Sequence, residues 1–479
     1  MSVSFGSAGA WMLVLLVVST VYSGLAVWLL LLGIASVFAC VGMASGIFTV
    51  DILAAVTARV LGLLENDLLQ ALPLYVGVGF LMDRLKIAQA IFGVVSVLLG
   101  RFGAGSGCAA LLLGALIAPM IGAVASSATV LGRVLGPQLH KMRSARAAAL
   151  ISLASTIGVV VPPSLVLLLL GDALMRAHSE AMQIPGLAQE TLRTINTQDV
   201  FHAALLPSLA LVSAWLVATW WQGRNTPAVQ FKISVGQTWT GWVSIVLIGL
   251  LFGGVFMGLL RAVEAAASAA IAMAFFGLLS KKMSHADWSI VLRETLELSG
   301  ALMALLVGAS VFSLVFRLFG TDIWITQALA NSYFSATVTA ALVLLGVGFC
   351  ALALDALEMI FVIIPIVAPP LIGLLRDAQQ VAVLLLLVLQ ASFLIPPVGY
   401  AVIVARVSVS PAPHAASMWR ALAPFMVIQA LALILVFRFP YLVHGLDATK
   451  TSEAPPSSLT IEDQLRAIGH SRSVRGSAD

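Results

Sequence analysis

Two acidic residues within a long apolar stretch are the first candidates for chemistry in this sequence. Residues 323–375 contain Asp355 and Glu358 and no other Asp, Glu, Lys or Arg. A charge at the centre of a bilayer costs about 2.5–3.5 kcal/mol, so an acid kept there indicates a functional site. The spacing of three places both side chains on one helix face. We expect Asp355, and secondarily Glu358, to bind a cation, because carboxylates are hard oxygen ligands. The alternative is a hairpin tip in water, where Asp caps a helix.

Small hydroxyl residues form two further candidate clusters. The first contains Ser126, Ser127 and Thr129, and the second contains Ser155 and Thr156. Hydroxyl and backbone groups beside a helix N-terminus suit an anionic substrate, because the positive end of the helix dipole points at the ligand. The alternative is that these small residues pack helices against one another.

Two Pro-Pro pairs interrupt the apolar segments that must position these residues. Pro162-Pro163 follows the second hydroxyl cluster, and Pro396-Pro397 precedes Gly399. The pairs lie 234 positions apart (396 − 162), about half of the chain. Proline removes a backbone donor and clashes one turn back, so each pair should break a helix. Two interrupted segments at matching places in two halves indicate a transporter binding site. Two unrelated proline kinks are the alternative.

The composition identifies the class of protein. Of 479 residues, 61% are hydrophobic and 10% are charged, whereas soluble domains carry roughly 25% charge. We therefore predict an all-α polytopic membrane protein in a lipid bilayer, with the first apolar run, from Trp11, retained as a membrane segment. The small net charge of +4 does not indicate a nucleic-acid partner. The three cysteines have no metal-binding spacing and are expected to be buried apolar residues.

The stretch 104–132 is predicted to form a re-entrant hairpin. Its 29 uncharged residues (132 − 104 + 1) would reach about 43 Å as one helix, against a hydrocarbon core of about 30 Å. Basic residues flank both of its ends. One long tilted helix is the alternative. If successive loops alternate between the two sides of the membrane, 336–374 is predicted to be a second hairpin that enters from the outside.

The distribution of basic residues supports this topology. In the loops and span ends up to Arg420, fourteen Lys and Arg fall on the side predicted to be cytoplasmic, against six on the other, in agreement with the positive-inside rule. Two hairpins of opposite entry and two broken helices form an inverted repeat. We predict a polar loop over 171–201 and five regions: N-terminal helices 1–103, a first repeat 104–222, connecting helices 223–294, a second repeat 295–445 and a flexible tail 446–479.

The sequence gives no support for an enzyme. It contains neither a phosphate-binding Gly-x-x-x-x-Gly-Lys-Ser/Thr run nor a His-Glu-x-x-His pair. Ser310 follows Gly308 and Ala309, but no histidine near membrane depth could activate it. An ion gradient or the gradient of the substrate must therefore supply the energy.

Taken together and in order, several motifs resemble the large permease subunit (DctM-like) of the tripartite ATP-independent periplasmic (TRAP) transporters. The resemblance covers about 71–436 and is carried by Leu72-Pro73-Leu74 with Gly79, Gly122 to Pro137, Thr156-Ile157-Gly158 through Pro162-Pro163-Ser164, Gly258 to Ala267, Leu354-Asp355 with Pro365, and Ile395-Pro396-Pro397-Val398-Gly399. It implies an elevator-type sodium symporter for organic acids in the bacterial cytoplasmic (inner) membrane. It further implies two partners, a small membrane subunit and a periplasmic substrate-binding protein.

The resemblance also implies two half-sites for Na⁺ and substrate. The first hairpin tip and first break would form one half-site. The second hairpin and second break would form the other. The residues that we predict to bind Na⁺ are Gly122, Ser126, Thr156, Gly158, Asp355 and Gly399. Those that we predict to bind the substrate are Ser126, Ser127, Thr129, Pro162, Pro163, Pro396 and Pro397.

The chain departs from the family pattern at two places. Ala125 stands where the first tip usually has glycine, and Arg261-Ala262-Val263-Glu264-Ala265 replaces a usual Thr-Pro-Thr-Glu-Ala run. We interpret Arg261 and Glu264 as a charge pair at the membrane edge. Two rival functions remain: a self-sufficient ion-coupled anion symporter, and a non-transporting membrane scaffold.

Overall fold

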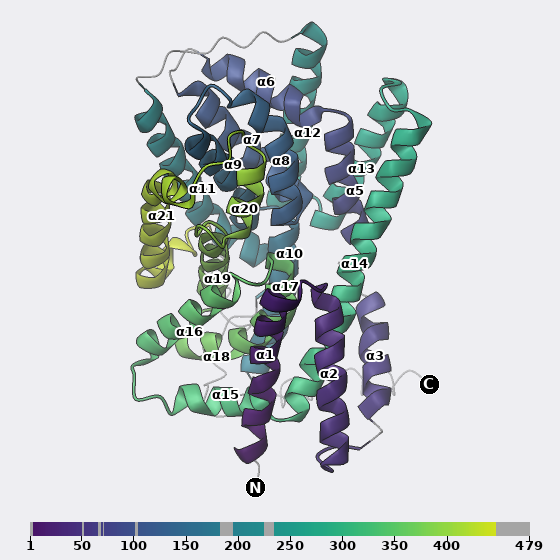
Figure 1. Ribbon diagram of the computed structural model, residues 1–479, viewed down its shortest axis with the longest axis vertical. Coiled ribbons are helices and arrows are strands. Elements are labelled where there is room, and N and C mark those ends of the chain that lie inside the picture. Colours follow the sequence, from purple (N-terminus) through teal and green to yellow (C-terminus); the bar gives the residue numbers. More distant parts are fainter. Residues whose placement is uncertain are drawn as a thin grey trace, which may run out of the picture. The chain divides into compact units, whose positions relative to one another are not determined.

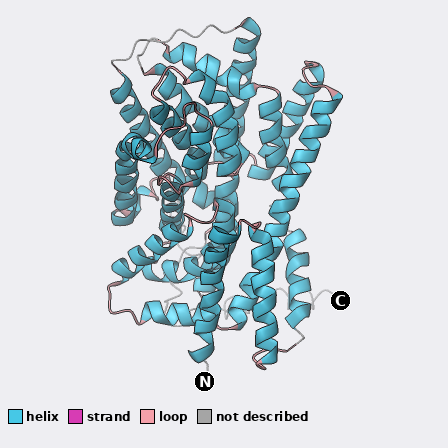
Figure 2. Ribbon diagram, in the orientation of Figure 1, coloured by secondary structure: helices cyan, strands magenta, loops and turns pink. Residues whose placement is uncertain are grey.

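In the computed structural model, every regular element among the described residues is helical (Figure 2). The structure describes residues 3–49, 52–65, 69, 71–100, 104–182, 195–224 and 234–446. Among them, eight helices are long and apolar enough to cross a membrane. The multi-pass membrane character predicted from composition is confirmed. Of the predicted tail 446–479, all but the first residue lies outside the described residues.

The first half of the chain contains ten described helices. In order they are α1 (Val3–Ser23), α2 (Val27–Ala44), α3 (Ile52–Leu64), α5 (Leu72–Arg84), α6 (Ile87–Leu99), α7 (Gly105–Ile121), α8 (Val124–Gln138), α9 (Ser144–Val160), α10 (Leu165–Ala181) and α11 (Thr197–Gly223).

The second half continues with α12 and ends on a short 3₁₀ turn. In order the elements are α12 (Val235–Phe256), α13 (Ala262–Leu279), α14 (His285–Leu318), α15 (Thr321–Ala330), α16 (Ala336–Cys350), α17 (Ala356–Glu358), the π-helical turn η2 (Met359–Ile363), α18 (Ile364–Leu375), α19 (Ala378–Phe393), α20 (Tyr400–Val407), α21 (Ala415–Arg438) and η3 (Pro440–Leu442).

Both predicted hairpins form. The first is α7 and α8, which pack against each other and are joined at Gly122, whose φ of 84° suits glycine. The second is α16 followed by α17, η2 and α18, with α16 packed on α18. Figure 1 shows the first hairpin in the upper half of the view and the second in the lower half.

Both predicted helix breaks form as well. Helix α9 ends at Val160 before Pro162-Pro163, and α10 begins after Ser164, whose Oγ accepts a hydrogen bond from the Leu167 N–H (3.2 Å). Helix α19 ends at Phe393 before Pro396-Pro397, and α20 begins after Gly399. Both proline pairs therefore end a helix rather than kink a continuous one.

The offset of 234 recurs outside the proline pairs and supports an internal repeat. Lys86 (φ 55°) and Gly320 (φ 67°) are separated by 234 and occupy the same left-handed position between two helices. Gly114 packs against Ala154, and its counterpart Gly348 packs against Val388, with both pairs again 234 apart. Helices α5 and α6 thus correspond to the end of α14 and to α15, which favours including them in the first repeat. The five predicted regions themselves stay predictions.

The hairpins and broken helices form an inner bundle, defined here as α7–α10 and α16–α20. Its two central helices, α9 and α19, are buried along most of their length. The two halves exchange partners, since the return arm α8 packs on α20 and the return arm α18 packs on α10. Gly136 on α8 permits this approach, because a Cβ there would lie 2.5 Å from the Ser408 carbonyl oxygen.

Three local expectations need correction. The predicted polar loop 171–201 is helical at both ends, because α10 continues to Ala181 and α11 begins at Thr197. Its residues 183–194 lie outside the described residues. The cysteines, expected to be buried, are not: Cys40 is exposed, and Cys108 and Cys350 are half-buried. Glu264 accepts a hydrogen bond from the backbone N–H of Arg261 (2.9 Å), so it caps α13.

Candidate ion and substrate site

Asp355 lies at the tip of the second hairpin, where it is the N-cap residue of α17. Its backbone N–H donates to Oε2 of Glu358 (2.9 Å), so Glu358 has a capping role and the i,i+3 spacing serves the helix start. The Asp355 Oδ1 is buried and has no hydrogen-bond partner among the residues that the structure describes. A buried carboxylate oxygen without a donor is costly unless another positive group satisfies it.

The tip of the first hairpin places its hydroxyl residues on different sides of α8. Ser127 is buried, Ser126 is half-buried and Thr129 is exposed. The Thr129 hydroxyl donates to the Ala125 carbonyl one turn back (2.9 Å). Gly122 lies against the start of α10, where a Cβ would come within 2.6 Å of Leu165 Cδ2. The first tip therefore meets the helix that follows the first break.

The residues before the first break are fully buried. The Ser155 and Thr156 hydroxyls donate to the carbonyls of Ser152 (2.9 Å) and Leu153 (3.0 Å), which leaves their oxygens free to accept or to ligate. Gly158 packs tightly on α7, where a Cβ would lie 2.5 Å from the Ala118 carbonyl carbon. Gly158 thus brings the first break against the first hairpin.

The two halves are joined by a hydrogen bond between repeat-related positions. The Gln390 side chain on α19 donates to the carbonyl oxygen of Thr156 on α9 (3.3 Å). These two residues are 234 apart, like the proline pairs. Equivalent positions of a two-fold repeat can meet only on its axis, so the pseudo-two-fold axis passes between them. Gln429 on α21 supports Gln390 by donating to its Oε1 (3.1 Å).

The second break lies beside the second hairpin. The Ser392 hydroxyl donates to the Gly348 carbonyl on α16 (2.9 Å). Tyr400, the first residue of α20, lies within electrostatic range of both Asp355 and Glu358. Pro396 and Gly399 are buried, whereas Pro397 is exposed. The structure thus joins each hairpin to a break and the two breaks to each other, while the individual site residues stay predictions.

The donor set at these tips fits an alkali cation better than a transition metal. Among the described residues, no three His, Cys, Asp or Glu side chains gather to hold a metal. The groups near the tips and breaks are the carboxylates of Asp355 and Glu358, hydroxyls and backbone carbonyls, which are hard oxygen ligands. The unpartnered Oδ1 of Asp355 is an atom that such a cation would satisfy.

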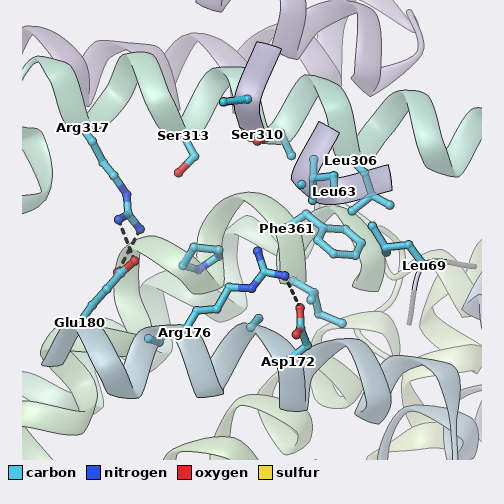
Figure 3. Close-up of a pocket in the computed structure, with 17 residues that line it drawn as sticks. Leu63, Leu69, Asp172, Arg176, Glu180, Leu306, Ser310, Ser313, Arg317 and Phe361 are labelled. Carbon is cyan, nitrogen blue, oxygen red and sulfur yellow. Dashed lines mark hydrogen bonds and ion pairs between the residues drawn. The ribbon is translucent and has the colours of Figure 1, made fainter. Parts of the chain in front are cut away.

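A cavity of about 510 Å³ separates part of the inner bundle from α14 and α3 (Figure 3). Arg317 of α14 crosses its edge and binds Glu180 of α10 through two hydrogen bonds of 2.7 and 2.9 Å. Arg176 binds Asp172 (2.8 Å) along the same helix. Ser310 and Ser313 of α14 lie on the opposite wall, and Phe361 of η2 projects into the cavity from below them.

Sequence reasoning missed two features of this region. Gln390 and Gln429 are uncharged, so a search for charges in apolar segments passes over them, although buried glutamines at membrane depth were a usable signal. The Arg317–Glu180 pair was missed because its residues are 137 apart and Glu180 lies in the predicted polar loop 171–201.

Comparison with known proteins gives the family. The model of the tripartite ATP-independent periplasmic transporter, DctM component, matches residues 10–442. The chain belongs to this family. This TRAP large permease is 23% identical over 349 residues to the C4-dicarboxylate TRAP transporter large permease protein DctM of Rhodobacter capsulatus, with 70% of this chain and 77% of that protein covered. It is 24% identical over 404 residues to the sialic acid TRAP transporter large permease protein SiaM of Vibrio cholerae, with 80% and 86% covered.

Solved structures support the fold of the TRAP large permease. The YdaH transporter of Alcanivorax borkumensis aligns with a TM-score of 0.60 at 14% identity, over 89% of this chain and 98% of that one. MtrF of Neisseria gonorrhoeae aligns with a TM-score of 0.55 at 13% identity, over 81% and 83%. The predicted transporter fold, with its hairpins and broken helices, is confirmed.

Proposed function

We propose that this TRAP large permease imports a small organic acid into the cell together with Na⁺. It works in the bacterial inner membrane with a small membrane subunit and a periplasmic substrate-binding protein. The family supports the two partners. The names of the relatives, which refer to C4-dicarboxylate and sialic acid, support an acid as cargo.

The observation that carries the sodium coupling is the unpartnered, buried Oδ1 of Asp355 at a hairpin tip. A carboxylate at this depth is costly unless a cation shares the site. Bound Na⁺ would in turn offset the charge of an anionic cargo next to it. Coupling follows, because each ion binds more tightly when the other occupies the site.

Transport requires that the site open to each side in turn. We propose that the inner bundle moves as a unit against the outer helices, in the manner of an elevator. The exchange of partners between halves supports this motion, because α8–α20 and α10–α18 contacts hold the bundle together internally. An inverted repeat around a central site is the usual basis of alternating access.

The experiment is uptake into liposomes that contain the purified permease and small subunit, with the ligand-loaded binding protein outside. A thermal-shift screen on the binding protein first identifies the acid. We expect uptake with an inward Na⁺ gradient and none when K⁺ replaces Na⁺. Equal uptake in the two salts would reject sodium coupling, and uptake without the binding protein would favour a self-sufficient symporter.

A further inference from the structure

The structure contains an ion pair that connects the inner bundle to α14, and we propose that it is a latch that breaks when the bundle moves. The latch is Arg317 of α14 bound to Glu180 of α10 (Figure 3). The proposal rests on the proposed function only in supposing that the bundle occupies two positions. The ion pair, the cavity beside it and the Asp172–Arg176 ion pair that serves as the control are features of the structure itself.

The geometry of the latch is that of a strong but releasable contact. Both guanidinium NH groups of Arg317 bind the two carboxylate oxygens of Glu180, at 2.7 and 2.9 Å. This bidentate arrangement has a defined orientation that a single contact lacks. The side chains are 29% and 34% exposed, so water can replace each partner when they separate. A fully buried pair would leave an unpaired charge and could not open at reasonable cost.

The cavity beside the latch leaves space for movement. It measures about 510 Å³ and is bounded by α10 and η2 of the bundle on one side and by α14 and α3 on the other. Close-packed interfaces resist sliding, whereas an unfilled space between two helices permits it. The latch therefore joins two elements that are otherwise loosely packed at this level.

A second ion pair connects the bundle to α5 at the related position of the repeat. Asp83 of α5 binds Arg133 of α8 (3.2 Å), and Asp83 lies 234 positions before Arg317. The adjacent Arg84 instead binds Asp287 of α14 (3.4 Å), so it connects α5 with α14. The equivalent positions Asp83 and Arg317, on the outer helices α5 and α14, thus each bind the inner bundle through an ion pair, but with charges of opposite sign.

The test measures the distance between bundle and α14 directly by double electron–electron resonance. Spin labels are attached to Leu296→Cys on α14 and Val407→Cys on α20, which are 69% and 84% exposed, after replacement of Cys40, Cys108 and Cys350. We expect Glu180→Gln and Arg317→Gln to increase a second distance population about two- to five-fold relative to the first. The charge swap Glu180→Arg with Arg317→Glu should restore the original ratio.

The matched control is Asp172→Asn, which removes an ion pair that lines the same cavity but stays within α10. It should leave the distances unchanged. If the glutamine variants fold poorly, Arg317→Lys takes their place. It keeps the positive charge but loses the two-pronged geometry of the guanidinium, so we expect a smaller shift in the distance populations. Distances that are the same in all variants, or that change as much in Asp172→Asn, would overturn the latch.

The same variants separate the latch from the proposed function. Uptake that is absent in the unaltered protein, with distances that still respond to Glu180→Gln, would reject transport and keep the latch. Uptake that depends on Na⁺, with distances that do not respond, would reject the latch alone.

Discussion

At the scale of single residues, one carboxylate carries most of the functional argument. Asp355 was a candidate in the sequence because it stands alone with Glu358 in an uncharged stretch. The structure gives the two residues different roles. Glu358 caps the Asp355 N–H, whereas Oδ1 of Asp355 has no hydrogen-bond partner among the described residues. Their roles should therefore differ on substitution.

Asp355→Asn should abolish sodium-dependent uptake while the protein folds normally, because the amide loses the charge that a cation requires. Glu358→Gln should retain uptake with a modest loss of stability, since an amide oxygen can still accept the Asp355 N–H. Uptake in liposomes and gel filtration of both variants check this. Unchanged sodium dependence in Asp355→Asn would remove Asp355 from the site.

Gln390→Leu should weaken the apparent affinity for Na⁺, because Gln390 holds the Thr156 carbonyl in the other half. The matched control is Gln380→Leu, which removes a buried glutamine from the same helix whose side chain donates to the Val436 carbonyl (2.9 Å) within the second half. Each change should destabilise by about 1–2 kcal/mol. The sodium dependence of uptake should shift in Gln390→Leu alone; equal shifts would mean that Gln390 acts through stability only.

The residue scale was the least predictable from sequence. Asp355 could be found because an isolated charge in an apolar run is visible locally. Gln390 meets Thr156, and Arg317 meets Glu180, across 234 and 137 positions. No local pattern indicates such partners, because only the folded bundle brings them together.

At the scale of elements, the hairpins and breaks follow from strong local signals. Pro-Pro pairs end helices by losing donors, and an uncharged run too long for one crossing favours a turn. Helix lengths were harder to predict from the sequence. Helix α10 extends to Ala181 across Asp172 and Arg176, because these two charged residues form an i,i+4 ion pair on the helix. Polar composition alone had predicted a loop.

Gly158→Ala should destabilise the protein by about 1–3 kcal/mol, because the new Cβ would meet the backbone of Ala118 on α7 at 2.5 Å. Gly346→Ala is the control, since a Cβ on this glycine of α16 meets nothing within 4 Å. It should be neutral or slightly stabilising. Thermal unfolding in detergent measures both. Similar melting temperatures for the two variants would contradict the close α7–α9 packing.

At the scale of the whole molecule, the offset of 234 organises the chain. The two proline pairs suggested it, and the Lys86/Gly320 and Gly114/Gly348 pairs extend it to the flanking helices. The correspondence of α5 and α6 with α14 and α15 was not seen in the sequence. The reason is physical: Lys86 and Gly320 adopt the same left-handed backbone conformation without sharing a residue type.

The inverted topology predicts which loops face each side of the membrane. Tyr333→Cys, between α15 and α16, should react with a membrane-impermeant maleimide added outside intact spheroplasts. His140→Cys, between α8 and α9, should react only after permeabilisation, because its loop carries basic residues. A background without the three native cysteines serves as control. Labelling of both sites from outside would contradict opposite entry of the hairpins.

The central claim is that the two halves together form a sodium site at the meeting of hairpins and breaks. Its most direct test is the melting temperature of the purified permease in NaCl against equal KCl, which needs neither partner nor cargo. A site for Na⁺ stabilises by on the order of 1.4 kcal/mol at ten times its Kd. We predict a rise in Na⁺ alone, reduced both by Thr156→Val in the first half and by Asp355→Asn in the second. Equal melting in the two salts, or a rise in Na⁺ that neither substitution reduces, would contradict the claim.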